Sequence, residues 1–313
     1  MLSPLLMGPL LLGGALVSFL EDDPSDPLAG FNTMSLIIKR EQIEHGGPAK
    51  GGIPALSRPE TTTIPRARFM SPKDRVVGVT VAGESRAYPI RILNWHEVIN
   101  DELGGIPILV AYCPLCDSVT VADRRLEGKR YEFGVSGKVY QSNLLLFDRT
   151  HNALWSQIGF MAVSGPNAGR SLQQLGNWQI TTYKHWRKRF PDSTVVTLNT
   201  GYPRDYGLNP YQDYMLHEGL LFGVDPLDER LPKKARVVGI RLGDSARAYP
   251  VEQIFASPKG VLRDNIGAGA VLLRGHRRSG TVILEKIPQG AKVAYSFWFA
   301  WAAQHPHTQI YKR

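Results

Sequence analysis

Cysteine is scarce in this chain: its 313 residues include only two, Cys113 and Cys116, spaced Cys-x-x-Cys. This spacing brings two sulfurs within reach of each other or of one metal ion. A structural zinc site needs four protein ligands, and the sequence holds no second cysteine pair to complete one. Any sulfur chemistry of this protein is therefore confined to a single position.

Motifs of several large enzyme classes are also missing. The sequence has no G-x-x-x-x-G-K-[ST] phosphate loop and no dinucleotide glycine fingerprint. It lacks H-E-x-x-H as well, because Asn100 stands where a second zinc-binding histidine would follow His96 and Glu97. These absences argue against the nucleotide-binding and metalloprotease classes. They leave open whether the protein is an enzyme.

Long basic segments are absent too. The formal net charge is +9, which allows attraction to polyanions or to anionic membrane surfaces. The basic residues are scattered, however, and cluster only briefly at residues 184–189, 233–236 and 274–278. The sequence therefore carries no strong signal for nucleic-acid binding, and it does not identify another partner.

Only residues 1–20 form a long apolar stretch, and they contain no charged residue. Their length suits a signal peptide or an N-terminal membrane anchor, which predicts a periplasmic, secreted or membrane-anchored protein. Pro4 and Pro9 interrupt a helix there and no basic residue precedes the stretch, so a buried N-terminal strand or a misassigned start is the alternative. Residues 21–69 are expected to form a linker and an extended segment.

Glycine and proline are modestly enriched, with 31 and 22 residues, which favours short strands and turns over long helices. We therefore expect a β-rich α+β fold of antiparallel sheets with a few short helices. Alternation of apolar and polar residues around glycine-containing turns predicts β-hairpins at residues 75–90 and 236–251.

These two hairpins form an internal repeat. They read RVVGVTVAGESRAYPI and RVVGIRLGDSARAYPV, and eight of sixteen positions are identical. A second similarity links WRKRFPDSTV at residues 186–195 with WAAQHPHTQI at residues 301–310. We predict two related halves from an internal duplication, residues 70–229 and 230–313, packed in one body. The second half is degenerate, because its middle section lacks both cysteines and any counterpart of His96.

The candidate site lies in the first half, where the apolar run IPILVAYCPLC at residues 106–116 ends in the cysteine pair. Pro89 and the following IRILNWHEVIND predict a helix with proline in its first turn. That helix would place these side chains on one face: Ile92, Trp95, His96, Ile99 and Leu103. Because the next strand turns back after Gly104 and Gly105, we expect His96 to approach Cys113.

Three functions fit this set. His96, Cys113 and Cys116 would bind copper or zinc, either with Asp148, His151 or Met161 as a fourth ligand or with one position left open. Alternatively, Cys113 and Cys116 would act catalytically in extracytoplasmic thiol–disulfide redox chemistry. The strand pattern after Cys116 argues against a thioredoxin-like site, which has a helix there. The third interpretation is a non-enzymatic interaction scaffold with a structural disulfide.

The run RAYPIRILNWHEVINDELGGIPILVAYCPLC and the later FGVSGKVYQSNLLLFDRTHNALWSQ resemble the bacterial and archaeal family named Domain of Unknown Function 3179. The resemblance covers about residues 40–313 and implies no particular activity, although it is consistent with export. Members of that family usually have glycine after the second cysteine, where this chain has Asp117. The resemblance therefore implies a carboxylate beside the site, and an oxygen ligand if the site binds a metal.

Overall fold

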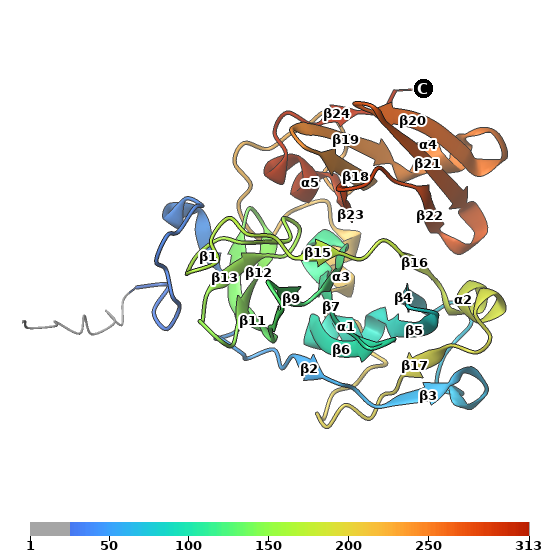
Figure 1. Ribbon diagram of the computed structural model, residues 1–313, viewed down its shortest axis with the longest axis horizontal. Helices are drawn as coiled ribbons and strands as arrows, with labels where there is room; N and C mark the ends of the chain where they lie inside the picture. The colour runs from blue at the N-terminus through green and yellow to red at the C-terminus, as the bar shows by residue number, and fades with distance from the viewer. Residues whose placement is uncertain (1–25, 313) are drawn as a thin grey trace, which may run out of the picture.

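The computed structural model describes residues 26–312 (Figure 1). The predicted β-rich architecture is confirmed, with mostly antiparallel sheets and short helices. The signal peptide or anchor predicted at residues 1–20 lies outside the described residues. None of the helices in the described part of the chain is long and apolar enough to cross a membrane.

The largest sheet has nine strands in the order β2-β6-β7-β8-β23-β18-β19-β24, and β15 also pairs with β8. Its strands are β2 (Leu56–Ser57), β6 (Val98–Leu103), β7 (Ile106–Cys113), β8 (Ser118–Asp123), β15 (Gln173–Gln174), β18 (Arg236–Leu242), β19 (Ser245–Pro250), β23 (Lys292–Phe297) and β24 (Gln309–Ile310). Strand β8 belongs to the first predicted half and β23 to the second, and they pair at Val119 and Tyr295. One sheet therefore passes through both halves, and their boundaries at residues 70–229 and 230–313 stay a prediction.

Four smaller sheets complete the structure. The strands of the second sheet are β16 (Trp178–Thr182), β4 (Arg75–Val81), β5 (Glu84–Pro89), β17 (Thr194–Val196) and β3 (Thr61–Thr63). Those of the third are β1 (Ile43–His45), β11 (Phe133–Tyr140), β12 (Asn143–Asp148), β13 (Leu154–Ser156) and β14 (Met161–Ala162). A three-stranded sheet holds β20 (Val261–Ile266), β21 (Gly269–His276) and β22 (Thr281–Lys286), and β9 (Arg125–Leu126) pairs with β10 (Lys129–Arg130).

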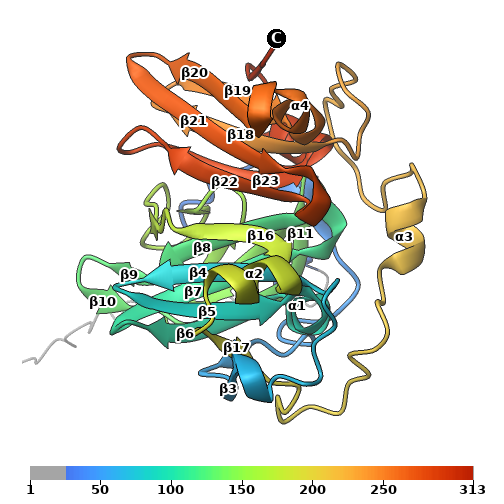
Figure 2. The same ribbon diagram turned by 90° about the vertical axis from the view of Figure 1, so that its right-hand side faces the viewer.

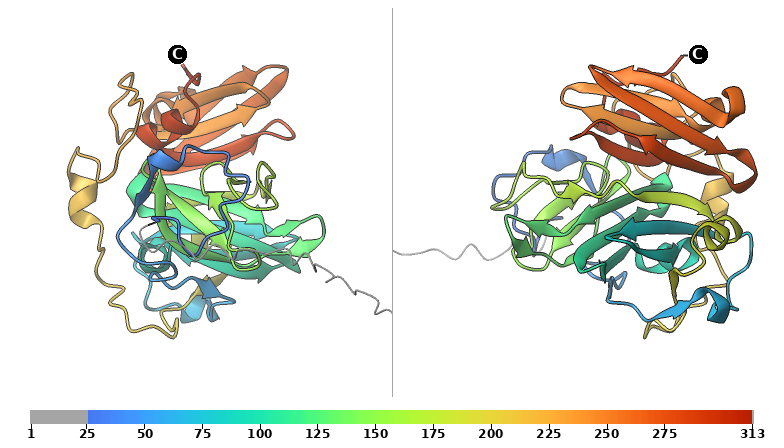
Figure 3. Two further views of the ribbon diagram at one scale, coloured as in Figure 1. Left: turned by 90° about the vertical axis from the view of Figure 1, so that its left-hand side faces the viewer. Right: turned by 45° about the vertical axis from the view of Figure 1, so that its right-hand side comes forward.

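The helices are short, and all but α3 directly follow a strand. They are α1 (Ile90–His96), α2 (Tyr183–Arg189), α3 (Gln212–Leu216), α4 (Val251–Ala256) and α5 (Trp298–Gln304), with 3-10 turns η1 (Arg40–Gln42), η2 (Ile64–Arg66), η3 (Pro114–Cys116), η4 (Pro258–Gly260) and η5 (Arg277–Ser279). Residues 197–235, which we call the crossing segment, run along the outside of the molecule from the first half to the second and carry α3 (Figures 2 and 3).

The same strand arrangement occurs twice. Strand β4 pairs with β16 and β5, and β5 pairs in parallel with β17. Strand β18 pairs in the same way with β23 and β19, and β19 with β24. In each copy a tryptophan packs on the glycine of the RVVG sequence: a Cβ on Gly78 would lie 2.1 Å from the Trp186 ring, and one on Gly239 would lie 2.2 Å from the Trp301 ring. Only glycine fits beneath these two rings.

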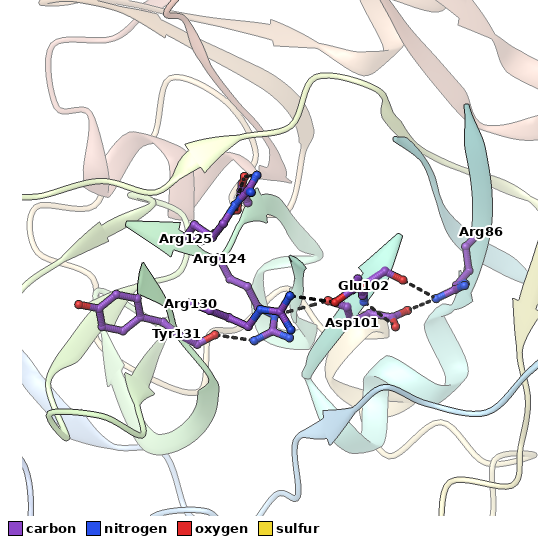
Figure 4. Close-up of polar contacts among 8 residues, drawn as sticks. Arg86, Asp101, Glu102, Arg124, Arg125, Arg130 and Tyr131 are labelled. Atoms are coloured by element: carbon purple, nitrogen blue, oxygen red, sulfur yellow. Dashed lines mark hydrogen bonds and ion pairs between the residues drawn. The ribbon is translucent and has the colours of Figure 1, made fainter. Parts of the chain in front are cut away.

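A buried ion pair joins β5 to β6 (Figure 4). Arg86 donates to the Asp101 carboxylate at 2.6 Å, and the Tyr88 hydroxyl donates to the same oxygen at 2.8 Å. The neighbouring Arg124, which is 2% exposed, donates to the Tyr131 carbonyl at 2.7 Å. These contacts supply partners to charges that would otherwise be costly to bury.

The predicted helix after Pro89 is only partly correct. Helix α1 ends at His96 because Glu97 has a positive, non-helical φ of 56°. Ile99 and Leu103, which were expected on the helix, lie in strand β6 opposite β7. The β-branched Val98 and Ile99 favour this extended pairing, and pairing with β7 outweighs the helical periodicity.

We predict that Asp101→Asn lowers the free energy of unfolding by about 3 kcal/mol, because it leaves the buried Arg86 without its counter-charge. The equivalent Asp264→Asn, opposite Arg247, should cost less. The side chains of Arg86 and Asp101 are 14% and 4% exposed, against 26% and 17% for the second pair. Urea denaturation of both variants measures the difference, and equal losses would contradict the role of burial.

Candidate functional site

The two cysteines lie in a tight connection between two central strands. Strand β7 ends at Cys113, the 3-10 turn η3 follows, and β8 begins at Ser118. The sulfur atoms are 3.3 Å apart without a disulfide, and both side chains are buried. Asp117 closes the turn with φ 45°, a conformation that only a few residue types adopt readily. The connection therefore holds two free thiols in contact.

A buried polar network supports Cys116. Its thiol donates to the carbonyl of Ser142 at 3.1 Å, and the side-chain amide of Asn143 lies 3.4 Å from the sulfur. The same Asn143 amide donates to Gln157 at 2.9 Å. Gln141 and Ser142 both have positive φ, 52° and 60°, so the turn between β11 and β12 points its carbonyl at the sulfur. Burial, followed by the contact with Cys113, raises the pKa of Cys116 well above its usual value.

Cys113 borders a cavity of about 120 Å³. The other lining residues come from the 46–53 loop, the residue after α1, η3, the β11–β12 sheet and the crossing segment. They are Gly46, Pro48, Ile53, Glu97, Pro114, Leu115, Val135, Gly137, Lys138, Val139, Leu144, Tyr211, Leu221 and Phe222. Cys116 does not line this cavity, so the two thiols have different surroundings.

Glu97 contributes a carboxyl group to the lining of this cavity. Its side chain is buried, and Oε1 accepts a hydrogen bond from the Tyr211 hydroxyl at 3.0 Å. Burial raises the pKa of Glu97 to about 7, and the hydrogen bond from Tyr211 offsets part of that increase. The group therefore exchanges a proton near neutral pH.

The crossing segment covers the site with aromatic residues. Tyr206 reaches His96, Tyr211 reaches Glu97, and the Tyr214 hydroxyl donates to the Leu115 carbonyl at 2.9 Å. The Ser142 hydroxyl donates to the Phe222 carbonyl at 3.1 Å. The crossing segment is therefore packed against the cysteine connection and the residues beside it.

His96 does not form a metal-binding group with the two thiols in the described part of the chain. The His96 ring is fully buried; Nδ1 lies 2.7 Å from the Pro54 carbonyl and Nε2 lies 2.7 Å from the Tyr206 hydroxyl. Both nitrogens are thus engaged away from the cysteines. Burial, the largest influence, lowers the pKa of His96, so the ring is neutral at neutral pH. The Glu97 carbonyl accepts a hydrogen bond from the Tyr112 amide at 2.7 Å, and the cavity that Cys113 borders is lined by Glu97 and not by His96.

The proposed fourth ligands lie elsewhere as well. Asp148 accepts a hydrogen bond from the Trp155 indole at 2.8 Å and lies 3.4 Å from His151. Met161 begins strand β14. Among the residues that the structure describes, no three His, Cys, Asp or Glu side chains are grouped to hold a metal ion.

Asp117 is turned towards two arginines. Nη2 of Arg75 donates to both carboxylate oxygens at 2.9 and 3.0 Å, and Nε of Arg236 donates to Oδ2 at 2.7 Å. The Tyr112 hydroxyl adds a bond at 3.0 Å. Although burial alone would raise it, the two guanidinium groups hold the pKa of Asp117 below its usual value. The carboxylate expected as an oxygen ligand is thus already engaged in ion pairs.

Residues 50–296 match the family model described as "Protein of unknown function (DUF3179)". The chain belongs to this family. The match covers most of the chain, which confirms the resemblance seen in the sequence. No curated protein and no solved structure matches the chain.

Sequence reasoning missed several residues around the thiols: Glu97, Ser142, Asn143, Gln157 and Tyr211. Two of the segments that carry the family resemblance, NWHEVIND and KVYQSNLLLFDRTHNALWSQ, contain four of them. Their contribution depends on contacts between distant parts of the chain, such as Tyr211 with Glu97, which spacing along the sequence does not indicate.

Glu97 should make stability fall as the pH rises. Its pKa of about 7 in the folded state exceeds the ordinary 4.5, so the folded protein binds more protons between these values. The free energy of unfolding therefore decreases from pH 4.5 to 7, by up to about 3 kcal/mol, and levels off above. Glu97→Gln should lack this component. Denaturation of wild type and Glu97→Gln between pH 4.5 and 7 measures this pH-dependent part of the free energy of unfolding. Parallel pH profiles of the two proteins would contradict its assignment to Glu97.

Proposed function

We propose that this protein exchanges thiols and disulfides, with Cys113 as the attacking cysteine and Cys116 as the resolving cysteine. The observation that carries the proposal is the pair of free sulfurs held 3.3 Å apart. A small closing movement from that separation forms a disulfide of about 2.05 Å. The asymmetry of the pair assigns the roles, because Cys113 borders the cavity and Cys116 faces the polar network.

The exchange would proceed through a mixed disulfide. The Cys113 thiolate attacks one sulfur of a substrate disulfide, which breaks the S–S bond and releases the first substrate thiol. The Cys116 thiolate then attacks the Cys113 sulfur, closes the internal disulfide and releases the second thiol. Two electrons pass to the substrate, and the two cysteine protons reach the released thiolates.

Glu97 is suited to accept the proton of Cys113. It lines the same cavity, and no α-helix begins at either cysteine in the described structure to stabilise a thiolate. A carboxyl group that titrates near neutral pH can take up the proton and return it within one cycle. This arrangement differs from a thioredoxin-like site, in agreement with the strand that follows Cys116.

Entry to the cavity involves the crossing segment. Leu221 lines the cavity and is 62% exposed, and Phe222 beside it is partly buried. The segment is attached near this point by Gly223, which donates to Glu44 at 2.9 Å, and by the Gln141–Asp225 pair at 2.8 Å. A substrate sulfur would reach Cys113 by displacing these few residues.

Wild-type protein equilibrated in glutathione redox buffers should form the Cys113–Cys116 disulfide reversibly, with a reduction potential above about −300 mV. Cys116→Ser should accumulate a mixed disulfide with glutathione on Cys113, because the resolving thiol is gone. Cys113→Ser, the matched control, should accumulate far less. Mass spectrometry of trapped thiols measures all three proteins.

Two outcomes would overturn this proposal. The first concerns the cysteine pair in the glutathione buffers. Either the pair forms no disulfide in any buffer, or its disulfide resists reduction in all of them and is structural, as in the scaffold interpretation. The other is stoichiometric copper or zinc in the reduced protein, lost in both cysteine variants, which would favour the metal site predicted from the sequence. If the His96→Ala variant kept that metal, the two thiols would be its ligands and His96 would not.

The two halves, we further propose, descend from one duplicated unit. The repeated strand pairing and the Trp–Gly contacts support this. So does the Arg86–Asp101 contact, which recurs as Arg247 with Asp264 at 2.5 Å. By position, the connection after β7 corresponds to the one after β21, where His276 and Ser279 replace the cysteines. One unit would thus retain the thiols while the other retains only the supporting frame.

Residues 1–20, we propose, direct export, on the basis of their uncharged apolar composition. In a bacterial host the full chain should appear outside the cytoplasm, whereas a chain starting at residue 21 should remain inside. Cell fractionation with immunodetection distinguishes them, and identical distribution of the two chains would contradict export by this segment.

A further inference from the structure

A cleft with two connected parts lies where the two halves meet. A cavity of about 150 Å³ adjoins a wider one of about 790 Å³, and both are lined by Arg75, Arg236, Val251 and Gly280. Asp117 and Ser296 both line the smaller part. The wider part lies within the size range of small-molecule sites.

Two arginines at equivalent positions meet in this cleft. Arg75 is the first residue of β4 and Arg236 the first residue of β18, and both hold the single carboxylate of Asp117. One carboxylate neutralises one guanidinium group, so one positive charge remains. Nη1 and Nη2 of Arg236 make no hydrogen bond to any residue of the described part of the chain. These donors are therefore available to a ligand.

Unpartnered polar groups line the same cleft. Ser296 is 3% exposed, and its buried hydroxyl has no hydrogen-bond partner among the described residues. The same holds for Nε of Arg91 in the wider part. Buried polar groups are normally paired with protein atoms or ordered water, so residues that line this cleft hold polar groups that a ligand can satisfy.

The side chains that line the cleft carry a net positive charge. Five basic side chains face three carboxylates, which leaves an excess of two positive charges. The basic residues are Lys73, Arg75, Arg91, Lys234 and Arg236, and the acidic residues are Asp74, Asp117 and Glu252. Of the acidic residues, Asp117 is only 3% exposed and lies behind its two arginines.

We propose that the cleft binds a small organic anion, with its carboxylate or phosphate group between Arg236 and Ser296 and the rest of the molecule in the wider part. Arginine pairs with either group through two parallel hydrogen bonds. The serine hydroxyl donates a further bond. This site uses different residues from the proposed thiol–disulfide exchange, so it does not depend on that proposal.

Isothermal titration of the full chain with inorganic phosphate and, separately, with succinate tests the proposal at constant ionic strength. Saturable binding of either probe is expected, and comparison of the two identifies the preferred group. Ser296→Ala should bind about 5-fold more weakly, the usual effect of losing one hydrogen bond. Since the hydroxyl has no partner to lose, this variant should keep its melting temperature.

Arg236→Gln should weaken binding by about 10-fold or more, because it removes a charged donor. Arg241→Gln is the matched control: Arg241 lies on the same strand, is exposed and does not line the cleft. Absence of saturable binding with both probes would overturn the proposal. So would unchanged affinity in Ser296→Ala, or equal weakening in the two arginine variants, which would indicate non-specific attraction.

Discussion

The ion pairs between one buried carboxylate and two arginines connect the main parts of this molecule. Asp117 follows Cys116 directly, Arg75 begins the first repeated hairpin and Arg236 begins the second. Breaking this arrangement would leave a charge buried without compensation, which is far more costly than losing a surface ion pair. The cysteine connection and the relative placement of the two hairpins are therefore coupled through a single side chain.

The surroundings of the thiols follow from the same packing. Two central strands deliver Cys113 and Cys116 into the interior, where Ser142, Asn143 and Gln157 satisfy polar groups around Cys116. The crossing segment then closes the other side with Tyr211 and Phe222. Reactivity in such a setting is governed by access and proton transfer rather than by exposure of the sulfurs.

The frame of the molecule was largely predictable from the sequence. Both RVVG hairpins, the strand ending at Cys113 and the strand after Cys116 follow the alternation and turn signals of their segments. The end of α1 was not predictable in this way. The pattern of Ile92, His96 and Ile99 suits a helix, but Glu97 has a positive φ and the next residues pair with β7. Helical periodicity and a buried strand compete for the same apolar residues, and tertiary pairing decides between them.

Local sequence determined the two thiols' spacing and the repeated hairpins, because each depends on residues close together in the chain. The tertiary structure alone decided that the His96 ring nitrogens pair with the Pro54 carbonyl and the Tyr206 hydroxyl. It also decided that Glu97 shares a cavity with Cys113 and that Asp117 faces two arginines. These contacts join residues up to 119 positions apart, and the spacing of residues along a chain does not specify which distant side chains will meet.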